Sequence, residues 1–452
     1  MTLNPADSAI FGGLYGTDEI RALFDDRRRL GFMLDVEVAL ARAQAALGII
    51  PAEAAEAIAA AADPATLDLV QIRAETEKAG QPVMALAKAL TQAAGPEAGR
   101  WVHWGATTQD VTDTAQVLQL RAALEIIGRD LLTLIRALAT QAERHRTLVM
   151  AGRSFLQQAL PVSFGYKAAV WLSPLLRHIE RLHQLKPRLL QVQFGGAVGT
   201  LASLGDQGRA VTERLAADLG LACPIAPWHS ARDGIAELGA WLGLLAGSLA
   251  KFAGDVTLLA QTEFGELVET TETGRGGSST MPQKRNPIIS THIVAAALGV
   301  EAQVPLLLAA QHHQLERAVG PWQAEALALP QALALTAGAL AQSIRVAEGM
   351  RPDPDRMRAN LAITNGLVMA ERVMMALADH LGRAEAHHLV QAACLAAMAE
   401  DRPLRDILGE TAEVAARLDP ATLDRLMDPA GYLGESAAVV DRVVAAARAL
   451  PA

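Results

Sequence analysis

Five stretches of this chain carry helical patterns that continue for about 25 to 40 residues each, or roughly 40 to 60 Å of α-helix. They cover residues 107–145, 161–191, 236–262, 287–313 and 322–349. Helices of this length exceed the globular average and are typical of an elongated bundle. Alternating strand patterns are scarce, so the sequence predicts an all-α fold.

The composition agrees with closely packed helices. Hydrophobic residues make up 51% of the 452 residues and charged residues 20%, whereas aromatic residues make up only 4%. The core must therefore consist mainly of small and aliphatic side chains, which fits helices better than sheets. Shorter helices are predicted over residues 29–47 and 51–62. The prolines of residues 351–355 mark a boundary before a smaller C-terminal helical region.

The charge balance and the cysteines exclude several classes of protein. Forty basic against forty-nine acidic residues give a net charge of −9, which argues against a nucleic-acid partner. The two cysteines, Cys223 and Cys394, cannot build a disulfide framework and suit a reducing cytosol. Residues 1–7 lack the basic start and apolar core of a signal peptide, so we expect a cytoplasmic protein.

Uncharged helical stretches point to burial or association. Residues 326–344 carry no charge and approach the length of a membrane span. Their apolar content is largely alanine and they include several polar residues, so we predict a helix buried in a bundle and no membrane partner. Residues 238–250 and 286–300 are also uncharged. This is more apolar surface than one bundle can hide, so the chain is expected to bind copies of itself.

The most informative segment is Gly274-Arg275-Gly276-Gly277-Ser278-Ser279-Thr280-Met281-Pro282-Gln283-Lys284-Arg285-Asn286-Pro287. Its glycines predict a mobile loop. Asn286-Pro287 is typical of an N-cap followed by proline at the first helical position, so free N–H groups beside Lys284 would form a receptor for a carboxylate. An ordinary flexible loop is the alternative, but such a loop needs neither the serine pair nor cations at a helix start.

Three segments resemble the signatures of the fumarase/aspartase superfamily. The loop matches Gly-Ser-Ser-x-Met-Pro-x-Lys-x-Asn, residues 105–114 resemble Thr-Ser-x-Asp-x-x-Asp-Thr, and residues 152–161 resemble Thr-His-x-Gln-x-Ala-x-Pro. The resemblance covers most of the chain. It implies all-helical homotetramers with a tetrameric multi-helix core, in which three subunits contribute loops to each active site. It also implies three helical domains, which we place at residues 1–108, 109–350 and 351–452.

The resemblance assigns roles to individual residues. Members remove a proton beside a carboxylate, and Ser278 would be the base. Lys284 and Asn286 would hold the carboxylate whose charge grows. Thr107 and Thr108 would donate hydrogen bonds to a substrate carboxylate, although Thr107 and Asp110 also have the spacing of a simple capping box. The other expected substrate contacts are His103, Arg153, Ser154, Gln157 and Ser279. His103 occupies the place of an active-site histidine of adenylosuccinate lyases, but a lone histidine is more often structural.

One departure indicates a particular branch of the superfamily. The histidine that acts as general acid in many members is Phe155 here, and the glutamate that orients it is Thr291. A carboxylate leaving group is already a stable anion and needs no such acid. This fits the 3-carboxy-cis,cis-muconate lactonizing enzymes (cycloisomerases) of the protocatechuate pathway, which carry an aromatic residue in place of this histidine.

Further stretches support the same branch. Residues 193–200, 227–233 and 316–322 resemble it, except that Ala231 replaces the usual glutamine and Leu315 the usual histidine. The resemblance implies an intramolecular lyase that interconverts 3-carboxy-cis,cis-muconate and 4-carboxymuconolactone, with Ser278 as general acid/base. The substrate is a small polycarboxylate. The candidate cations for its three carboxylates are Lys284, Arg153, Arg232 and Arg317.

Three alternatives stay open. The changes at Ala231 and Leu315 suggest a sulfomuconate cycloisomerase, and His103 is compatible with a fumarate-releasing lyase such as adenylosuccinate lyase. A non-catalytic helical protein is the third.

No metal or organic cofactor is expected. Residues 195–199 are rich in glycine but lack the preceding strand and the spacing of a dinucleotide loop. The adjacent pairs His312-His313 and His387-His388 point to different sides of a helix and cannot bind one ion as an i, i+4 pair does.

Overall fold

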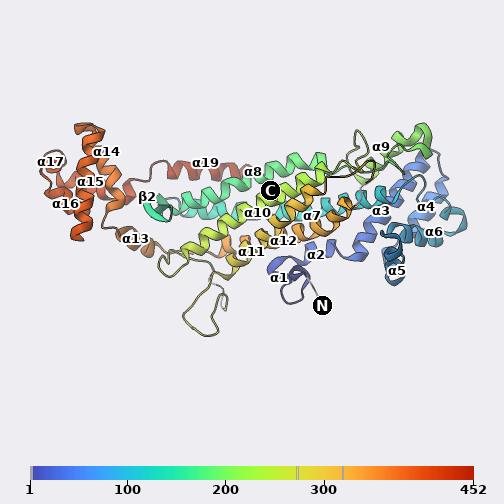
Figure 1. The fold of residues 1–452 in the computed structure, drawn as a ribbon, viewed down its shortest axis with the longest axis horizontal. Helices are drawn as coiled ribbons and strands as arrows, with labels where there is room; N and C mark the ends of the chain where they lie inside the picture. The colour runs from blue at the N-terminus through green and yellow to red at the C-terminus, as the bar shows by residue number, and fades with distance from the viewer. Residues whose placement is uncertain (1–3, 271, 273, 318–319, 452) are drawn as a thin grey trace. The chain divides into compact units, whose positions relative to one another are not determined.

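The computed structural model describes residues 4–270, 272, 274–317 and 320–451, and it confirms a largely helical fold (Figure 1). Five long helices match the five predicted stretches to within four residues at either end. They are α7 (Thr108–Arg144), α8 (Phe164–Leu189), α10 (Asp233–Leu259), α11 (Ile288–Ala309) and α12 (Pro321–Gly349).

The chain forms two compact units. Unit 1 comprises the residues up to Leu131, His178–Ala250 and His292–Ala341, and unit 2 comprises Leu132–Arg177, Lys251–Thr291 and the residues from Gln342 onward. The long helices contribute residues to both units. The division into three domains at residues 108 and 350 stays a prediction.

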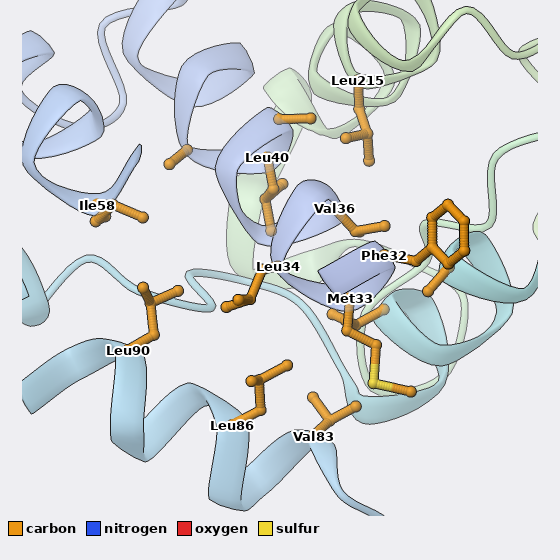
Figure 2. Packing of buried hydrophobic residues seen from close by; sticks show 14 of the residues in the cluster. Phe32, Met33, Leu34, Val36, Leu40, Ile58, Val83, Leu86, Leu90 and Leu215 are labelled. Atoms are coloured by element: carbon orange, nitrogen blue, oxygen red, sulfur yellow. The ribbon is translucent and has the colours of Figure 1, made fainter. Parts of the chain in front are cut away.

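Unit 1 also contains shorter helices, several of which share one hydrophobic core. These helices are α1 (Gly12–Tyr15), α2 (Asp18–Leu23), α3 (Asp26–Ala46), α4 (Ala52–Ala61), α5 (Leu69–Ala79), α6 (Val83–Gly99) and α9 (Gly208–Leu219). Figure 2 shows Leu40 of α3 in the same cluster as Ile58 of α4 and Leu86 of α6. Helix α3 is buried along most of its length, and its buried residues include two polar ones, Glu37 and Gln44. Glu37 contacts His103, and Gln44 contacts the adjacent Trp104.

Small residues allow the long helices to approach closely. An added Cβ at Gly239 of α10 would lie 2.7 Å from Leu307 of α11, and one at Gly243 would lie 2.8 Å from Val304. These distances leave no room for a side chain, so α10 and α11 meet through glycine. The low aromatic content of the chain is consistent with such close packing.

Side chains cap several helix starts, which fixes where the helices begin. Thr17 accepts the Ile20 N–H at the start of α2, and Asp353 accepts two N–H groups at the start of α13 (Pro354–Ala362). The capping contact predicted at α7 also forms, because the Thr107 N–H donates to Oδ2 of Asp110 at 3.0 Å.

Unit 2 contains a β-hairpin that we did not predict. β1 (Val149–Ser154) pairs antiparallel with β2 (Gln157–Ser163), so α8 begins at Phe164 rather than at residue 161. A register shift lies between Ala151 and Arg153. Glycine, proline and such bulges interrupt the alternating pattern by which a strand is recognised, and this hairpin contains all three.

The remaining elements of unit 2 are a short strand pair and small helices. β3 (Leu267–Val268) pairs with β4 (Arg351–Pro352). After α13 follow α14 (Ala370–Leu381), α15 (Arg383–Glu400), α16 (Leu404–Glu410), α17 (Ala412–Ala415), α18 (Pro420–Met427) and α19 (Ser436–Arg448). Val373, Leu377 and Leu404 are fully buried among the helices that follow α13.

Apolar side chains remain exposed on the long helices. Leu244 on α10 is 55% exposed, Leu298 on α11 is 61% exposed and Leu327 on α12 is 66% exposed. By length and composition alone, α10, α11 and α12 could each cross a membrane. Residues 326–344 of α12 are nevertheless largely buried within the protein, as predicted for a bundle helix.

Candidate active site

The predicted site residues fall into one group in each unit. Unit 1 holds His103, Thr107, Thr108, Arg232 and Arg317. Unit 2 holds Arg153, Ser154, Gln157, Ser278, Ser279, Lys284 and Asn286.

Ser278 lies in the loop between β3 and α11, and backbone contacts close the neck of this loop. Gly277 and Arg285 form an isolated antiparallel bridge. Asn286 donates to the Gly276 carbonyl from its backbone N–H at 2.8 Å and from its side chain at 3.1 Å. Gly276 has a φ of +70°, and a Cβ there would meet the Asn286 carbonyl oxygen at 2.3 Å. This neck therefore requires glycine.

The Ser278 hydroxyl oxygen accepts two backbone N–H groups. Thr280 donates at 3.3 Å and Met281 at 3.0 Å, which forms a serine turn. Ser278 is half-buried, whereas Ser279 is exposed. Two amide donors on one hydroxyl oxygen favour negative charge on that oxygen.

A cavity of about 330 Å³ is lined by residues of this loop. Lys284 and Asn286 line it together with Glu269, Glu272 and Arg275. Arg275 is paired with Glu272. Within the described part of the chain no ion pair holds Lys284, whose side chain is exposed, so its ammonium group can receive an anion.

The start of α11 differs from the prediction. Asn286 does not cap the helix, because its side chain donates to Gly276. Instead the carboxylate of Glu269, which is 6% exposed, accepts the N–H groups of Ile289 at 3.1 Å and Ser290 at 2.6 Å. The predicted receptor of free N–H groups is therefore wrong, since a carboxylate of the protein already binds at this helix N-terminus.

In unit 1 the start of α7 is built around the buried carboxylate of Asp110. This carboxylate accepts the N–H groups of Gly195 and Gly196, both at 2.9 Å, and His229 Nε2 lies 2.7 Å from it. These two amides of the glycine-rich segment are thus bound within the protein and are not available to a phosphate.

Thr107 and Arg317 come together at this helix start. Arg317 donates to Oγ1 of Thr107 at 3.2 Å and to the Ala197 carbonyl at 2.8 Å. Thr108, the first residue of α7, is half-buried. The fold therefore brings one predicted cation and two predicted threonines to one helix N-terminus, an arrangement that favours an anion.

His103 precedes this helix start and has a partner that sequence reasoning missed. Its Nδ1 lies 2.6 Å from Oε1 of Glu37, whose side chain is 1% exposed. Burial acts to lower the pKa of His103. The hydrogen bond to Glu37 and the negative charges of Glu37 and Asp110 outweigh burial and raise that pKa above its ordinary value.

Arg232 is bound by carboxylates of its own unit. Its guanidinium donates to Asp113 at 2.6 and 3.1 Å and to Glu325 at 2.8 Å, and its side chain is 1% exposed. Trp322 donates to the same Asp113 carboxylate at 2.9 Å. Burial raises the pKa of Glu325 although the contact with Arg232 opposes this. The ion pairs occupy donors that a substrate would need, so the predicted substrate contact of Arg232 stays a prediction that they do not support.

The hairpin of unit 2 carries the remaining candidates. Arg153 makes a two-pronged ion pair with the fully buried Glu266, at 2.8 and 2.9 Å, and stacks on the Phe264 ring. Ser154 and Gln157 pair across the two-residue turn, and both are exposed. Arg153 is therefore committed to a carboxylate, whereas Ser154 and Gln157 can meet a ligand.

Positions 155 and 291 contain no histidine–glutamate pair. Phe155 lies at the tip of the hairpin and is 99% exposed, with a φ of +50°. The Thr291 hydroxyl donates to carbonyl groups at the start of its own helix, at 2.8 and 3.0 Å. Neither side chain can supply the acid or the carboxylate of the usual pair.

The described residues contain no group of three or more His, Cys, Asp or Glu side chains that could hold a metal ion.

Comparison with known proteins places the chain in a family. Residues 14–301 match the family model described as lyase, and residues 366–443 match the model described as adenylosuccinate lyase C-terminus. A Pseudomonas aeruginosa protein named 3-carboxy-cis,cis-muconate cycloisomerase is 49% identical, over 98% of this chain and 97% of that protein. A Mycosarcoma maydis protein named trans-aconitate decarboxylase 1 is 42% identical, over 97% of this chain and 89% of that protein.

A solved structure agrees with these relatives. The crystal structure of 3-carboxy-cis,cis-muconate lactonizing enzyme from Pseudomonas putida has a TM-score of 0.92 and 45% identity, and the match covers 98% of this chain and 99% of that one. The chain therefore belongs to the lyase family, within the fumarase/aspartase superfamily that its three signature segments resemble.

Proposed function

We propose that this protein is a 3-carboxy-cis,cis-muconate cycloisomerase, an intramolecular lyase that interconverts 3-carboxy-cis,cis-muconate and 4-carboxymuconolactone. The observation that carries the proposal is an intact serine loop combined with Phe155 and Thr291 at the positions of the missing acid pair. Departure of a carboxylate requires no proton, so this reaction can proceed without that pair. The name of the Pseudomonas aeruginosa relative, which matches nearly the whole chain, supports it.

The reaction assigned to Ser278 is a proton transfer to carbon. One substrate carboxylate adds to the conjugated double bond, a C–O bond forms, and the displaced electron pair becomes an aci-carboxylate. Ser278 then gives its hydroxyl proton to the carbon beside that carboxylate. In the reverse direction the Ser278 alkoxide takes this proton and the ring carboxylate leaves. The N–H groups of Thr280 and Met281 on the Ser278 oxygen support the alkoxide.

The remaining residues bind the substrate carboxylates. Lys284 and Asn286 hold the carboxylate that becomes the aci-carboxylate, where one well-placed donor contributes about 10²- to 10³-fold in rate. Thr107, Thr108 and Arg317 bind a second carboxylate at the start of α7. The other proposed contacts are His103, Arg153, Ser154, Gln157, Arg232 and Ser279. Of these, Arg153 and Arg232 would have to release their present carboxylate partners.

The proposed active form is a cytoplasmic homotetramer whose active sites are shared between subunits. The exposed leucines of α10, α11 and α12 are the surface that further copies would cover. If further copies of the chain cover these leucines, the apolar helices need no membrane. The net charge of −9 disfavours binding to nucleic acid. The isomerisation is redox-neutral, so the proposed chemistry requires no cofactor.

The direct test follows the diene absorbance of 3-carboxy-cis,cis-muconate with the purified protein. The wild type should remove the absorbance, and Ser278→Ala should slow this by about 10²- to 10⁴-fold, the usual contribution of a general acid or base. Gln283→Ala removes an exposed amide side chain from the same loop and should retain wild-type turnover. A wild type without turnover, or equal rates for wild type and Ser278→Ala, contradicts the proposal.

Competing substrates separate the neighbouring reactions. A sulfonated muconate tests the specificity suggested by Ala231 and Leu315. Adenylosuccinate tests for release of fumarate, and trans-aconitate tests the activity named for the Mycosarcoma maydis relative. We expect the highest kcat/KM for 3-carboxy-cis,cis-muconate.

A further inference from the structure

The segment before α7 holds His103 in a rarely used backbone conformation. His103 has a φ of +59°, in the left-handed region that few residues other than glycine adopt. Gln44 of α3 donates to the Trp104 carbonyl at 2.7 Å, and the Trp101 and Trp104 rings lie 5.0 Å apart. A conformation of this kind persists only where the surroundings fix it, and such residues cluster at functional sites.

Among the groups around His103, the carboxylate of Glu37 can form an ion pair with the ring. Glu37 lies on α3 beside the buried Val36, and Oε1 is 2.6 Å from Nδ1 of His103. A carboxylate that is 1% exposed is costly to bury unless a cation pairs with it. The imidazolium form of His103 is the partner that meets this requirement.

The other charged group that acts on His103 is also negative. It is Asp110 of α7, so the charges from α3 and from α7 both favour the protonated ring. In the imidazolium form Nδ1–H donates to Glu37, and the remaining ring nitrogen, Nε2, is a second N–H donor. No hydrogen bond to Nε2 occurs among the described residues, and the side chain is 25% exposed.

His103 lies close in sequence to Thr107 and the start of α7, where its Nε2–H could bind an anion. The Ala106 N–H donates to the His103 carbonyl at 3.3 Å, so a tight turn leads from His103 directly to Thr107. Thr107 accepts a hydrogen bond from Arg317 at the N-terminus of α7. A second cation at this place adds to an electrostatic field that already favours an anion.

We propose that Glu37 is a positioning residue that holds His103 as an imidazolium, whose Nε2–H binds a substrate carboxylate beside Thr107 and Arg317. The identity of the substrate rests on the proposed function, whereas the charged pair rests on the contacts of unit 1. No proton is transferred in this role. The imidazolium is a fixed donor and a fixed charge for a polyanionic ligand.

The test replaces Glu37 with its uncharged isostere and measures the charge of His103 directly. Deuterium exchange at the histidine C2 position, followed by mass spectrometry across pH, reports the pKa of each histidine in the full protein. In the wild type His103 should titrate above its ordinary value of about 6.5, and in Glu37→Gln it should titrate at lower pH. Glu56→Gln, an exposed change on α4 of the same unit, should leave the titration unchanged.

The second measurement is binding of tricarballylate, an unreactive tricarboxylate, by calorimetry. Glu37→Gln should weaken binding by about tenfold near pH 7.5, because the ligand loses a hydrogen bond from a charged donor. Because the pKa of His103 is raised, wild-type binding should persist below that pKa and weaken as the pH rises through it. In Glu37→Gln the weakening should begin at lower pH.

The outcomes separate this inference from the proposed function. A normal titration of His103 in the wild type overturns the inference, and so does a titration that moves while tricarballylate affinity stays constant, since the pair is then only structural. Far-UV circular dichroism checks that Glu37→Gln is folded. If the wild type fails to convert 3-carboxy-cis,cis-muconate, the proposed function fails, yet the exchange and calorimetry results still decide the role of Glu37.

Discussion

Unit 1 and unit 2 each carry a part of the proposed site, and the two parts are held in different ways. Around the start of α7 in unit 1, Asp110 binds two backbone amides and an imidazole, and Arg232 binds two carboxylates, all in buried surroundings. In the loop of unit 2, Lys284 is exposed and Ser278 is half-buried, and contacts at Gly276 and Asn286 close the neck. The start of α7 in unit 1 is preorganised, whereas the loop of unit 2 leaves Lys284 without an ion pair among the described residues.

This difference fits the two roles proposed for these residues. A binding site for a fixed carboxylate gains from donors that are locked in place before the substrate arrives. A serine that transfers a proton must be protected from water only while the substrate is bound, which a movable loop allows. Changes in the network of unit 1 should therefore act first on stability, and changes in the loop should act first on turnover.

The largest effect on stability is expected at the buried ion pairs of unit 1. Arg232→Met leaves Asp113 and Glu325 buried without their cation, so the free energy of unfolding should fall by about 3–5 kcal/mol. Urea unfolding at a fixed protein concentration measures this change. Arg73→Met removes an exposed arginine that is paired with Glu77 on α5 and should cost less than about 1 kcal/mol.

The same variant decides between two roles for Arg232. A variant of wild-type stability that has lost affinity for the substrate would support the substrate contact predicted from the sequence. A destabilised variant would support the buried network and would preserve the contrast between the two units.

A smaller loss is expected at the anchor of the serine loop. Glu269→Ala removes the carboxylate that accepts the N–H groups of Ile289 and Ser290, which should cost about 1–2 kcal/mol. Hydrogen exchange in the first turn of α11 should become faster. Glu272→Ala, an exposed change in the same loop, should leave that exchange unaltered. Unchanged exchange in Glu269→Ala would show that the loop is anchored by other contacts.

The helices could be predicted because their signals are local. The apolar repeats of α7 and α12 extend over many turns, and the capping contact between Thr107 and Asp110 spans three residues. The loop around Ser278 could also be assigned, since its residues are contiguous. The β1–β2 hairpin was missed because glycine, proline and a bulge obscure its alternation.

The charged contacts could not be predicted, because they join residues far apart in the chain. Arg232 lies 119 residues from Asp113 and 93 from Glu325, and Glu37 lies 66 residues from His103. In a sequence, an arginine looks equally suited to a substrate carboxylate and to one of the protein's own. The fold decides between them, and in unit 1 it pairs Arg232 with carboxylates of the protein.

The smallest effect on stability is expected at residues with a positive φ, which occur in both units. In unit 2 the hairpin turn places Phe155 at a φ of +50° and Leu156 at a φ of +63°, a conformation for which two-residue turns favour Asn-Gly. The double change Phe155→Asn and Leu156→Gly should therefore raise the free energy of unfolding by about 1 kcal/mol.

His103 of unit 1 provides the contrast, because it has a similar φ of +59° but a buried partner. His103→Gly relieves the same backbone strain and leaves the Glu37 carboxylate without its hydrogen bond, so it should destabilise the protein. Thermal unfolding of both variants measures the two signs. Shifts in the same direction would mean that relief of backbone strain has the same net effect at both sites. The contrast between the two units would then be lost.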